Sequence, residues 1–223
     1  MNKFFFYISI SICTLAISCK QSNYNSPNST ESGKFDNSVI STVLLTPPEY
    51  VTWCQNKENK LKKLKEIEEL TFSLQYKPAE YVVCMEEKAD KISTNSLKEK
   101  LSELQGLDYY DFKIEVPSAI GELLKYNVST PSEYNQRVNY FAFDMQHDVK
   151  LLDGNDTLDC MLFHFERAYD IAPSAIFLLG FPKTKSKNSQ RTFFYQDKVF
   201  NKGIIKFTYT KDELSQIPKL KTI

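Results

Sequence analysis

The sequence predicts an α+β fold, with helices mainly in the first half and an antiparallel β meander in the second half. Helical patterns gather before Tyr126, whereas from Tyr140 onward the chain consists of short aromatic-rich runs separated by turn residues. The repeated alternation of one strand with one helix, which is typical of parallel folds, is absent after Tyr140. The two halves therefore predict segregated helices and strands.

The first three elements are predicted from residue spacing. Segment 49–54 is rich in aromatic and branched residues, which suit a strand or a short helix, and either one should bury Trp53. In 60–69 apolar residues recur at every third position, which favours a helix, although so short a run leaves a strand open. Segment 70–76 alternates apolar with polar residues and predicts a strand. Its inward side chains would be Leu70, Phe72, Leu74 and Tyr76.

Two further helices, a strand and a short helix complete the first half. Pro78 suits the first helical position, where its missing N–H costs nothing, and the helix would run over 79–91. A second helix over 96–105 would have its leucines on one face. The alternation of 109–116 predicts a strand, and 118–126 predicts a short helix.

The second half predicts strands joined by turns. The apolar runs cover 140–145, 149–152, 158–169, 175–181, 192–195 and 203–210. Asp153-Gly154-Asn155-Asp156 is a strong turn signal, which predicts a hairpin between two of these strands. The polar, basic segment 183–190 is predicted to be a loop that projects into solvent.

The N-terminal residues have the pattern of an export signal. Lys3 supplies a positive charge, and an apolar run over 4–15 follows it. This run gives out at Lys20, short of the roughly 20 apolar residues that span a bilayer. We therefore expect the segment to be removed rather than retained as a membrane helix.

The end of this run resembles the lipobox of bacterial lipoproteins. Leu15-Ala16-Ile17-Ser18 places small or apolar residues directly before Cys19. The resemblance implies a signal peptide over 1–18, cleavage before Cys19, and acylation of Cys19 with palmitate-type chains. Two or three chains would anchor the protein durably, since each buried methylene contributes about 0.8 kcal/mol. The alternatives are an ordinary secretory signal, in which Cys19 is incidental, and an uncleaved anchor.

The remaining chain is predicted to be a tether followed by one domain. Segment 19–42 is rich in Ser and Asn and poor in apolar residues, so it cannot bury enough surface to order itself. Segment 43–223 is long enough for a single α+β domain. The signal, the tether and the Tyr- and Asn-rich composition look like many uncharacterised lipoproteins of the Bacteroidota. That resemblance covers mainly residues 1–40 and implies no activity.

Composition argues against a nucleic-acid partner. The chain has 28 Lys and Arg against 28 Asp and Glu, so it lacks the basic footprint that such proteins need. The expected partner is a membrane, contacted through lipid on Cys19, with an outer-membrane location that faces the periplasm or the exterior. An envelope protein or a glycan is a further candidate partner.

Three cysteines remain in the predicted domain, namely Cys54, Cys84 and Cys160. At most one disulfide can form among them, in a compartment that permits disulfides. Buried free thiols that pack as small apolar residues are the favoured interpretation.

His164 and Glu166 are the first candidates for chemistry. Side chains two positions apart in a strand point to the same face, where this pair could bind a metal or transfer a proton. The competing interpretation is a solvent-facing surface opposite Phe163 and Phe165. We favour the solvent-facing surface.

Two acidic segments are weaker candidates. Asp144, His147 and Asp148 offer oxygen and nitrogen ligands, but their spacing fits no metal motif, and a polar turn explains them. A two-histidine zinc site would require His147 and His164 to meet in space. Segment 153–159 has the oxygen-rich composition of a calcium loop but lacks its closing glutamate, so a hairpin turn is favoured.

No catalytic motif is found. The sequence has no Gly-x-Ser-x-Gly elbow, and six glycines give little material for a phosphate-binding loop. We therefore expect no catalytic residue, no metal site and no cofactor. The favoured function is a non-enzymatic binding or assembly module of the cell envelope. The alternatives are an envelope hydrolase or metal-dependent enzyme that uses His164 and Glu166, and a protective, immunity-type lipoprotein.

Overall fold

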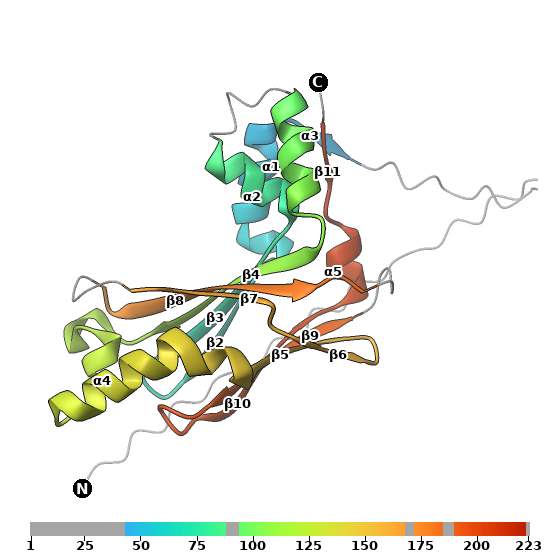
Figure 1. Ribbon diagram of the computed structural model, residues 1–223. Helices are drawn as coiled ribbons and strands as arrows, with labels where there is room; N and C mark the ends of the chain where they lie inside the picture. The colour runs from blue at the N-terminus through green and yellow to red at the C-terminus, as the bar shows by residue number, and fades with distance from the viewer. Residues whose placement is uncertain (1–42, 88–93, 168–171, 185–189, 222–223) are drawn as a thin grey trace, which may run out of the picture. The chain divides into compact units, whose positions relative to one another are not determined.

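The computed structural model describes residues 43–87, 94–167, 172–184 and 190–221. Within this part of the chain the strands form a five-stranded sheet, a four-stranded sheet and a two-stranded pair (Figure 1). The five-stranded sheet contains β2 Lys62–Ile67, β3 Leu70–Lys77, β4 Leu107–Glu115, β8 Ser174–Pro182 and β7 Leu162–Glu166, in that spatial order. The four-stranded sheet contains β10 Gly203–Tyr209, β9 Arg191–Asp197, β5 Val149–Asp153 and β6 Asp156–Asp159.

All neighbours within the two larger sheets are antiparallel. The short strands β1 Leu44–Leu45 and β11 Lys219–Leu220 pair in parallel. The first and last described elements therefore lie side by side.

The two larger sheets pack face to face around the main core. Leu74, Phe112 and Phe177 lie in one row across β3, β4 and β8, and all three are fully buried. The ring of Phe112 lies 5.1 Å from that of Phe193 and 5.3 Å from that of Tyr195, both on β9 of the other sheet. Alternating side chains point to opposite faces of a strand, so this spacing directs one face of each sheet into the core.

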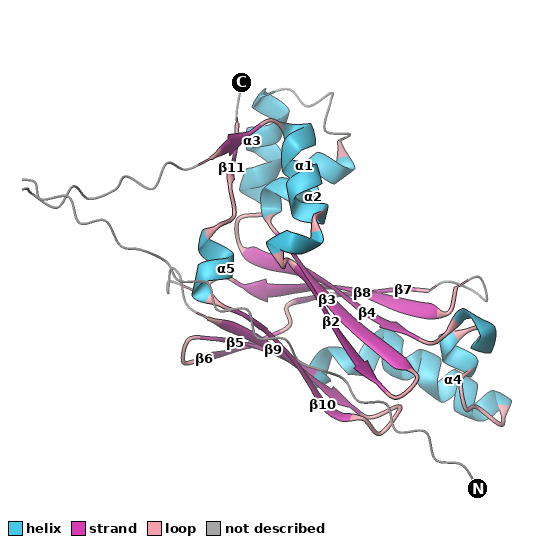
Figure 2. Cartoon of the chain, turned by 180° about the vertical axis from the view of Figure 1, so that it is seen from behind, coloured by secondary structure: helices cyan, strands magenta, loops and turns pink. Residues whose placement is uncertain are grey.

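The helices occupy two separate places (Figure 2). One group contains α1 Pro47–Gln55, α2 Ala79–Glu86 and α3 Thr94–Glu103. The other contains α4 Pro131–Asn139, η4 Tyr140–Asp144 and η5 Met145–Asp148. The remaining short elements are η1 Lys57–Asn59, η2 Ser118–Ile120, η3 Leu123–Lys125 and α5 Lys211–Ser215. Tyr50 and Cys54 of α1, Tyr81 of α2 and Leu61 form a second, smaller core.

The predicted α+β arrangement, with helices first and a meander second, is wrong. The described residues contain eleven strands in three sheets, and their helices are short. Three strands of the five-stranded sheet come from the first half of the chain and two from the second. Periodicity reports which face of a segment is buried, but it does not report which distant strand pairs with it, and this pairing decides the architecture.

Segment 60–69 is a strand and not the favoured helix. Of the apolar residues at every third position, Leu61 is fully buried, whereas Leu64 is 60% exposed. The segment pairs with β3 along its length, from Lys62 opposite Gln75 to Ile67 opposite Leu70. Pairing with a partner strand therefore overrides a weak helical spacing.

Segment 140–145, predicted to be a strand, is helical. Phe141 and Met145 are buried and lie four residues apart, which is the spacing of one helix face. The predicted strand 158–169 is also interrupted, because β6 ends at Asp159 in one sheet and β7 begins at Leu162 in the other. The predicted short helix 118–126 consists of two 3-10 turns.

Trp53 is only half-buried, and Tyr50 and Cys54 occupy the buried face of α1 instead. The strands predicted over 70–76 and 109–116 are confirmed by β3 and β4. The predicted helices over 79–91 and 96–105 correspond to α2 and α3, although 88–93 lies outside the described residues.

The predicted signal peptide 1–18, the tether 19–42 and Cys19 lie outside the described residues. The signal peptide, the tether, the acylated cysteine and the boundary at 43 therefore stay predictions. No helix in the described part of the chain is long and apolar enough to cross a membrane.

Candidate functional site

Strand β7 carries the His164 and Glu166 pair. Both side chains are exposed, as the alternation predicts. Phe163 and Phe165 point the other way, and their rings lie 5.8 Å and 5.2 Å from that of Phe177. The two phenylalanines therefore hold β7 onto the core, and the His164 and Glu166 pair faces outward.

β7 is also an edge strand, since β8 is its only hydrogen-bonded neighbour among the described strands. The start of β7 is apolar and accessible to solvent. Met161, directly before the strand, is 67% exposed, and Leu162, its first residue, is 37% exposed. Element η4 contacts β7 through the rings of Phe141 and Phe165, 5.8 Å apart, and leaves Phe143 70% exposed. We call residues 161–166 the β7 edge.

The opposite edge of the same sheet differs in charge. β2 carries three lysines, Lys62, Lys63 and Lys65. Charged side chains, lysine above all, discourage a second chain from adding to an edge strand. The β7 edge contains no lysine, so the two edges of one sheet differ in their capacity to accept another strand.

The second predicted cluster does not form one site. Asp148 accepts a hydrogen bond from the Tyr140 hydroxyl at 2.9 Å and pairs with Lys198 at 2.7 Å. Asp144 and His147 are exposed. Across the described residues, no group of three or more His, Cys, Asp and Glu side chains has the arrangement of a metal site.

The predicted hairpin at 153–156 is confirmed. β5 and β6 pair with Asp153 opposite Asp156, and Gly154 has a positive φ of 62° in the two-residue turn between them. The Asp153 carboxylate is 1% exposed and accepts a hydrogen bond from Thr184 at 2.6 Å. This carboxylate points into the protein, so the hairpin does not present the oxygen set of a calcium loop.

A buried polar cluster joins the two larger sheets, and sequence patterns did not indicate it. Arg191 of β9 pairs with Asp108 of β4 at 3.0 Å and with Asp153 of β5 at 3.6 Å. The Tyr76 hydroxyl donates to Asp108 at 3.1 Å, and Arg191 lies over the Tyr76 ring. Burial alone would lower the pKa of Arg191, but nearby Tyr110 and Asp108 keep it above the ordinary value.

The members of this cluster give no local signal. Asp108 and Arg191 each stand at the start of a strand, where charged residues are common, and they are 83 positions apart in the chain. Only the pairing of distant strands brings them together. Because their charges face one another inside the protein, the cluster acts as a structural tie between the sheets.

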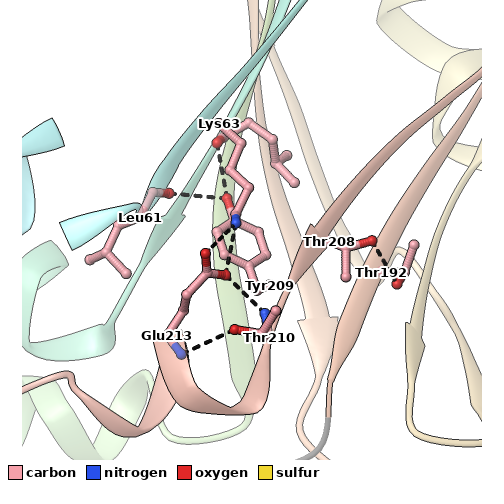
Figure 3. A network of polar contacts seen from close by, with 8 residues as sticks. Leu61, Lys63, Thr192, Thr208, Tyr209, Thr210 and Glu213 are labelled. Carbon is pink, nitrogen blue, oxygen red and sulfur yellow. Dashed lines mark hydrogen bonds and ion pairs between the residues drawn. The ribbon is translucent and has the colours of Figure 1, made fainter. Parts of the chain in front are cut away.

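A second tie links β10 and α5 to the β2–β3 hairpin (Figure 3). The buried Tyr209 hydroxyl lies 3.0 Å from the main-chain oxygen of Leu61 and 2.9 Å from that of Leu74, and its single proton is shared between these two acceptors. Lys63 pairs with Glu213 at 2.7 Å and lies 5.0 Å from the centre of the Tyr209 ring. The hydroxyl and the ion pair thus hold the C-terminal segment against the five-stranded sheet.

The described surface also has a hollow of about 430 Å³ on α1. Its lining residues are Leu45, Pro48, Glu49, Thr52, Trp53 and Asn56. The half-buried Trp53 therefore lines a surface depression and also packs against the second core.

Comparison with known proteins gives little guidance. No family model matches the chain, and no curated protein matches it. Among solved structures, the chain is similar to a DUF4426 family protein from Pseudomonas aeruginosa, with 8% sequence identity and a TM-score of 0.33. That comparison covers 67% of this chain and 92% of the other. We therefore infer function from the residues of this chain alone.

Proposed function

We propose that the chain is an envelope lipoprotein, anchored through acyl chains on Cys19, whose folded part binds another envelope protein without catalysing a reaction. The lipobox-like residues before Cys19 support the anchor. The β7 edge supports the binding role, and it is the observation that carries the proposal. The location that fits is the outer membrane, on its periplasmic or exterior side.

The β7 edge suits a partner that adds one strand to the sheet. An edge strand has main-chain N–H and C=O groups without a strand partner on one side, and an extended segment can pair with them. The exposed Met161 and Leu162 would contact apolar side chains of that segment. Main-chain pairing would supply affinity, and these side chains would supply specificity.

The carboxylates inside the fold are engaged in contacts that hold the structure together. Asp108 and Asp153 share Arg191, and Asp148 is held by Tyr140 and Lys198. Asp197 accepts three hydrogen bonds from the main-chain N–H groups of Val199, Phe200 and Lys202. These carboxylates are used to hold strands and turns together.

The anchor is tested by intact-mass analysis of the protein extracted from membranes. We expect a chain that begins at Cys19 and carries two or three acyl chains, and Cys19→Ala should abolish both the cleavage and the added mass. Cys13→Ala is the matched control, since it makes the same substitution inside the apolar run. An unmodified chain that keeps residues 1–18 would contradict the anchor.

The binding role is tested by a photo-crosslinking amino acid placed at position 162 or at position 64 of the full chain in its envelope. Both positions hold leucines on edge strands of one sheet, 37% and 60% exposed. We expect a discrete crosslinked partner from position 162 and none from position 64. With the crosslinker moved to position 161, which is 67% exposed, the partner should be lost in the Leu162→Lys protein but not in the Leu64→Lys protein. Equal crosslinking at the two positions would contradict a role for the β7 edge.

A further inference from the structure

Helices α1 and α2 pack against each other through matched faces. Tyr50 and Cys54 lie four residues apart on α1, so they share one face, and both are buried. Tyr81 and Cys84 lie three apart on α2 and are also buried. Gln55 of α1 places its amide 3.4 Å from the Tyr81 hydroxyl and 3.9 Å from the Met85 sulfur. These contacts put position 54 beside the turn of α2 that holds position 84.

Cys54 and Cys84 are both free, buried thiols in the structure, and they lie within electrostatic range of each other. Burial raises the pKa of Cys54 to about 12, and the neighbouring Cys84 adds to this rise. Burial raises the pKa of Tyr50, and the nearby Glu80, Cys54 and Cys84 add to this rise. Burial likewise raises the pKa of Cys84 to about 11.

Cys160 lies elsewhere. It belongs to the main core, between β6 and β7, whereas Cys54 belongs to the second core. Its thiol donates to the main-chain oxygen of Leu162 at 2.9 Å. Of the three cysteines in the described part of the chain, only Cys54 and Cys84 are neighbours.

We propose that Cys54 and Cys84 form a disulfide that joins α1 to α2 in the exported protein, while Cys160 stays a thiol. The inference rests on the proposed export of the chain, because disulfides persist in oxidising compartments. The bond would close a loop that contains the whole β2–β3 hairpin. It would therefore hold the helices at the end of the five-stranded sheet.

The chemistry needs an oxidant that carries its own disulfide, such as a thiol oxidase of the envelope or oxidised glutathione. One cysteine thiolate attacks this disulfide and releases one oxidant sulfur as a thiol. The second cysteine thiolate then attacks the mixed disulfide and releases the other oxidant sulfur. In balance, Cys54 and Cys84 lose two protons and two electrons, and the oxidant disulfide becomes a dithiol.

The order of events follows from burial. Folded protein disfavours both thiolates, since the pKa values of Cys54 and Cys84 stand above their usual range. The bond therefore forms while α1 and α2 are still docking. Afterwards the same burial shields it from reducing thiols.

The test uses full-length protein taken from cell envelopes, quenched in acid, denatured and alkylated with and without prior reduction. Peptide mass analysis should find Cys160 alkylated in both samples, and Cys54 and Cys84 only after reduction. A peptide that links residue 54 to residue 84 should be present before reduction. Alkylation of Cys54 and Cys84 without reduction, or a bond to Cys160, would overturn the inference.

Single-cysteine variants sharpen the result. Cys54→Ala should leave Cys84 open to alkylation without reduction, and Cys84→Ala should do the same for Cys54. Cys160→Ala is the matched control, which should keep the bond. The mass at Cys19 is read from the same samples, so a lipidated chain with free thiols would refute the disulfide alone.

A refolding experiment separates the geometry from the compartment. Reduced full chain is refolded in mixed reduced and oxidised glutathione, and the bonds are mapped. Selective pairing of Cys54 with Cys84 supports the inferred geometry, whatever the export route. Random pairing among the cysteines, or none, overturns it and leaves the proposed function untouched.

Discussion

The hydroxyl of Tyr209 donates to the main-chain oxygen of Leu61 across the boundary between the two larger sheets, over 3.0 Å. Tyr209 closes β10 of the four-stranded sheet, and Leu61 directly precedes β2 of the five-stranded sheet. The ring of Tyr110 lies 6.0 Å from that of Tyr209 and is equally buried. Its hydroxyl, however, has no hydrogen-bond partner among the described residues. The two tyrosines are therefore equally buried and differ in whether the hydroxyl makes a hydrogen bond.

Tyr209→Phe should lower the free energy of unfolding by about 1–2 kcal/mol, because it leaves two buried main-chain oxygens with one donor fewer. Tyr110→Phe should leave stability unchanged or raise it, because it removes a buried hydroxyl that makes no hydrogen bond. Urea unfolding of both variants measures the difference. Equal losses would show that ring packing, and not the hydroxyl of Tyr209, sets the cost.

Arg191→Met should destabilise the protein by about 3–5 kcal/mol, because it leaves the carboxylates of Asp108 and Asp153 buried without their cation. Adding Asp108→Asn and Asp153→Asn should recover part of the loss, since the buried charge is then gone. Thermal and urea unfolding test this. No recovery in the triple variant would mean that packing of the arginine side chain, rather than charge, dominates.

Stability should depend on the pH through Glu213. Burial opposes its charge, but the hydrogen bond from Lys63 keeps the pKa of Glu213 below its ordinary value of 4.5. A carboxyl with a lowered folded pKa stabilises the fold above its unfolded pKa, and this contribution disappears as the pH falls through the folded value. Glu213→Gln should therefore cost about 1 kcal/mol near neutral pH and nothing in strong acid.

The check on Glu213 is a set of urea unfolding curves for the parent and for Glu213→Gln between neutral pH and strong acid. In a Lys63→Met background, the same substitution should show little dependence on pH. The exposed Glu66 lies on β2, the strand that carries Lys63, and serves as the control site. Glu66→Gln should change stability little. A difference in the free energy of unfolding between the parent and Glu213→Gln that persists unchanged in acid would rule out the ion pair with Lys63 as its source.

Gly180 should be intolerant of a side chain. A Cβ at this position would lie 2.9 Å from Cβ of Leu162 and 3.0 Å from Cδ1 of Leu107. Gly180→Ala should cost about 1–3 kcal/mol, because β7 must move away from β8. Leu162→Gly should relieve the loss when combined with Gly180→Ala, and urea unfolding of the double variant measures this. Leu162→Ala keeps its Cβ and should not relieve it.

The strands with strong alternation were predictable, and their partners were not. Phe72 and Phe112 each lie in a run whose period fixes the buried face, and the structure buries both. Nothing local states that β4 pairs with β8, whose residues follow their partners by 59 to 75 positions, rather than with a nearer strand. The predicted separation of helices and strands failed for this reason.

Of the candidate site, only the features set by neighbouring residues in the sequence were predictable. The shared face of His164 and Glu166 follows from strand geometry alone. Their place on an edge strand depends on the strand order of the whole sheet, as does the meeting of Arg191 with Asp108. The neighbourhood of Cys54 and Cys84 likewise depends on how α1 docks on α2.

The parallel pair of β1 and β11 has a mechanical consequence. Main-chain hydrogen bonds run from Lys219 to Val43 over 3.0 Å and from Lys221 to Leu45 over 2.7 Å. In a chain anchored at Cys19, as proposed, tension from the membrane would enter the fold at these two bonds. Removal of residues 219–223 would delete β11 and leave β1 without its partner strand. The force would then reach the fold at α1, and the segment before α1 would be longer by the residues of β1.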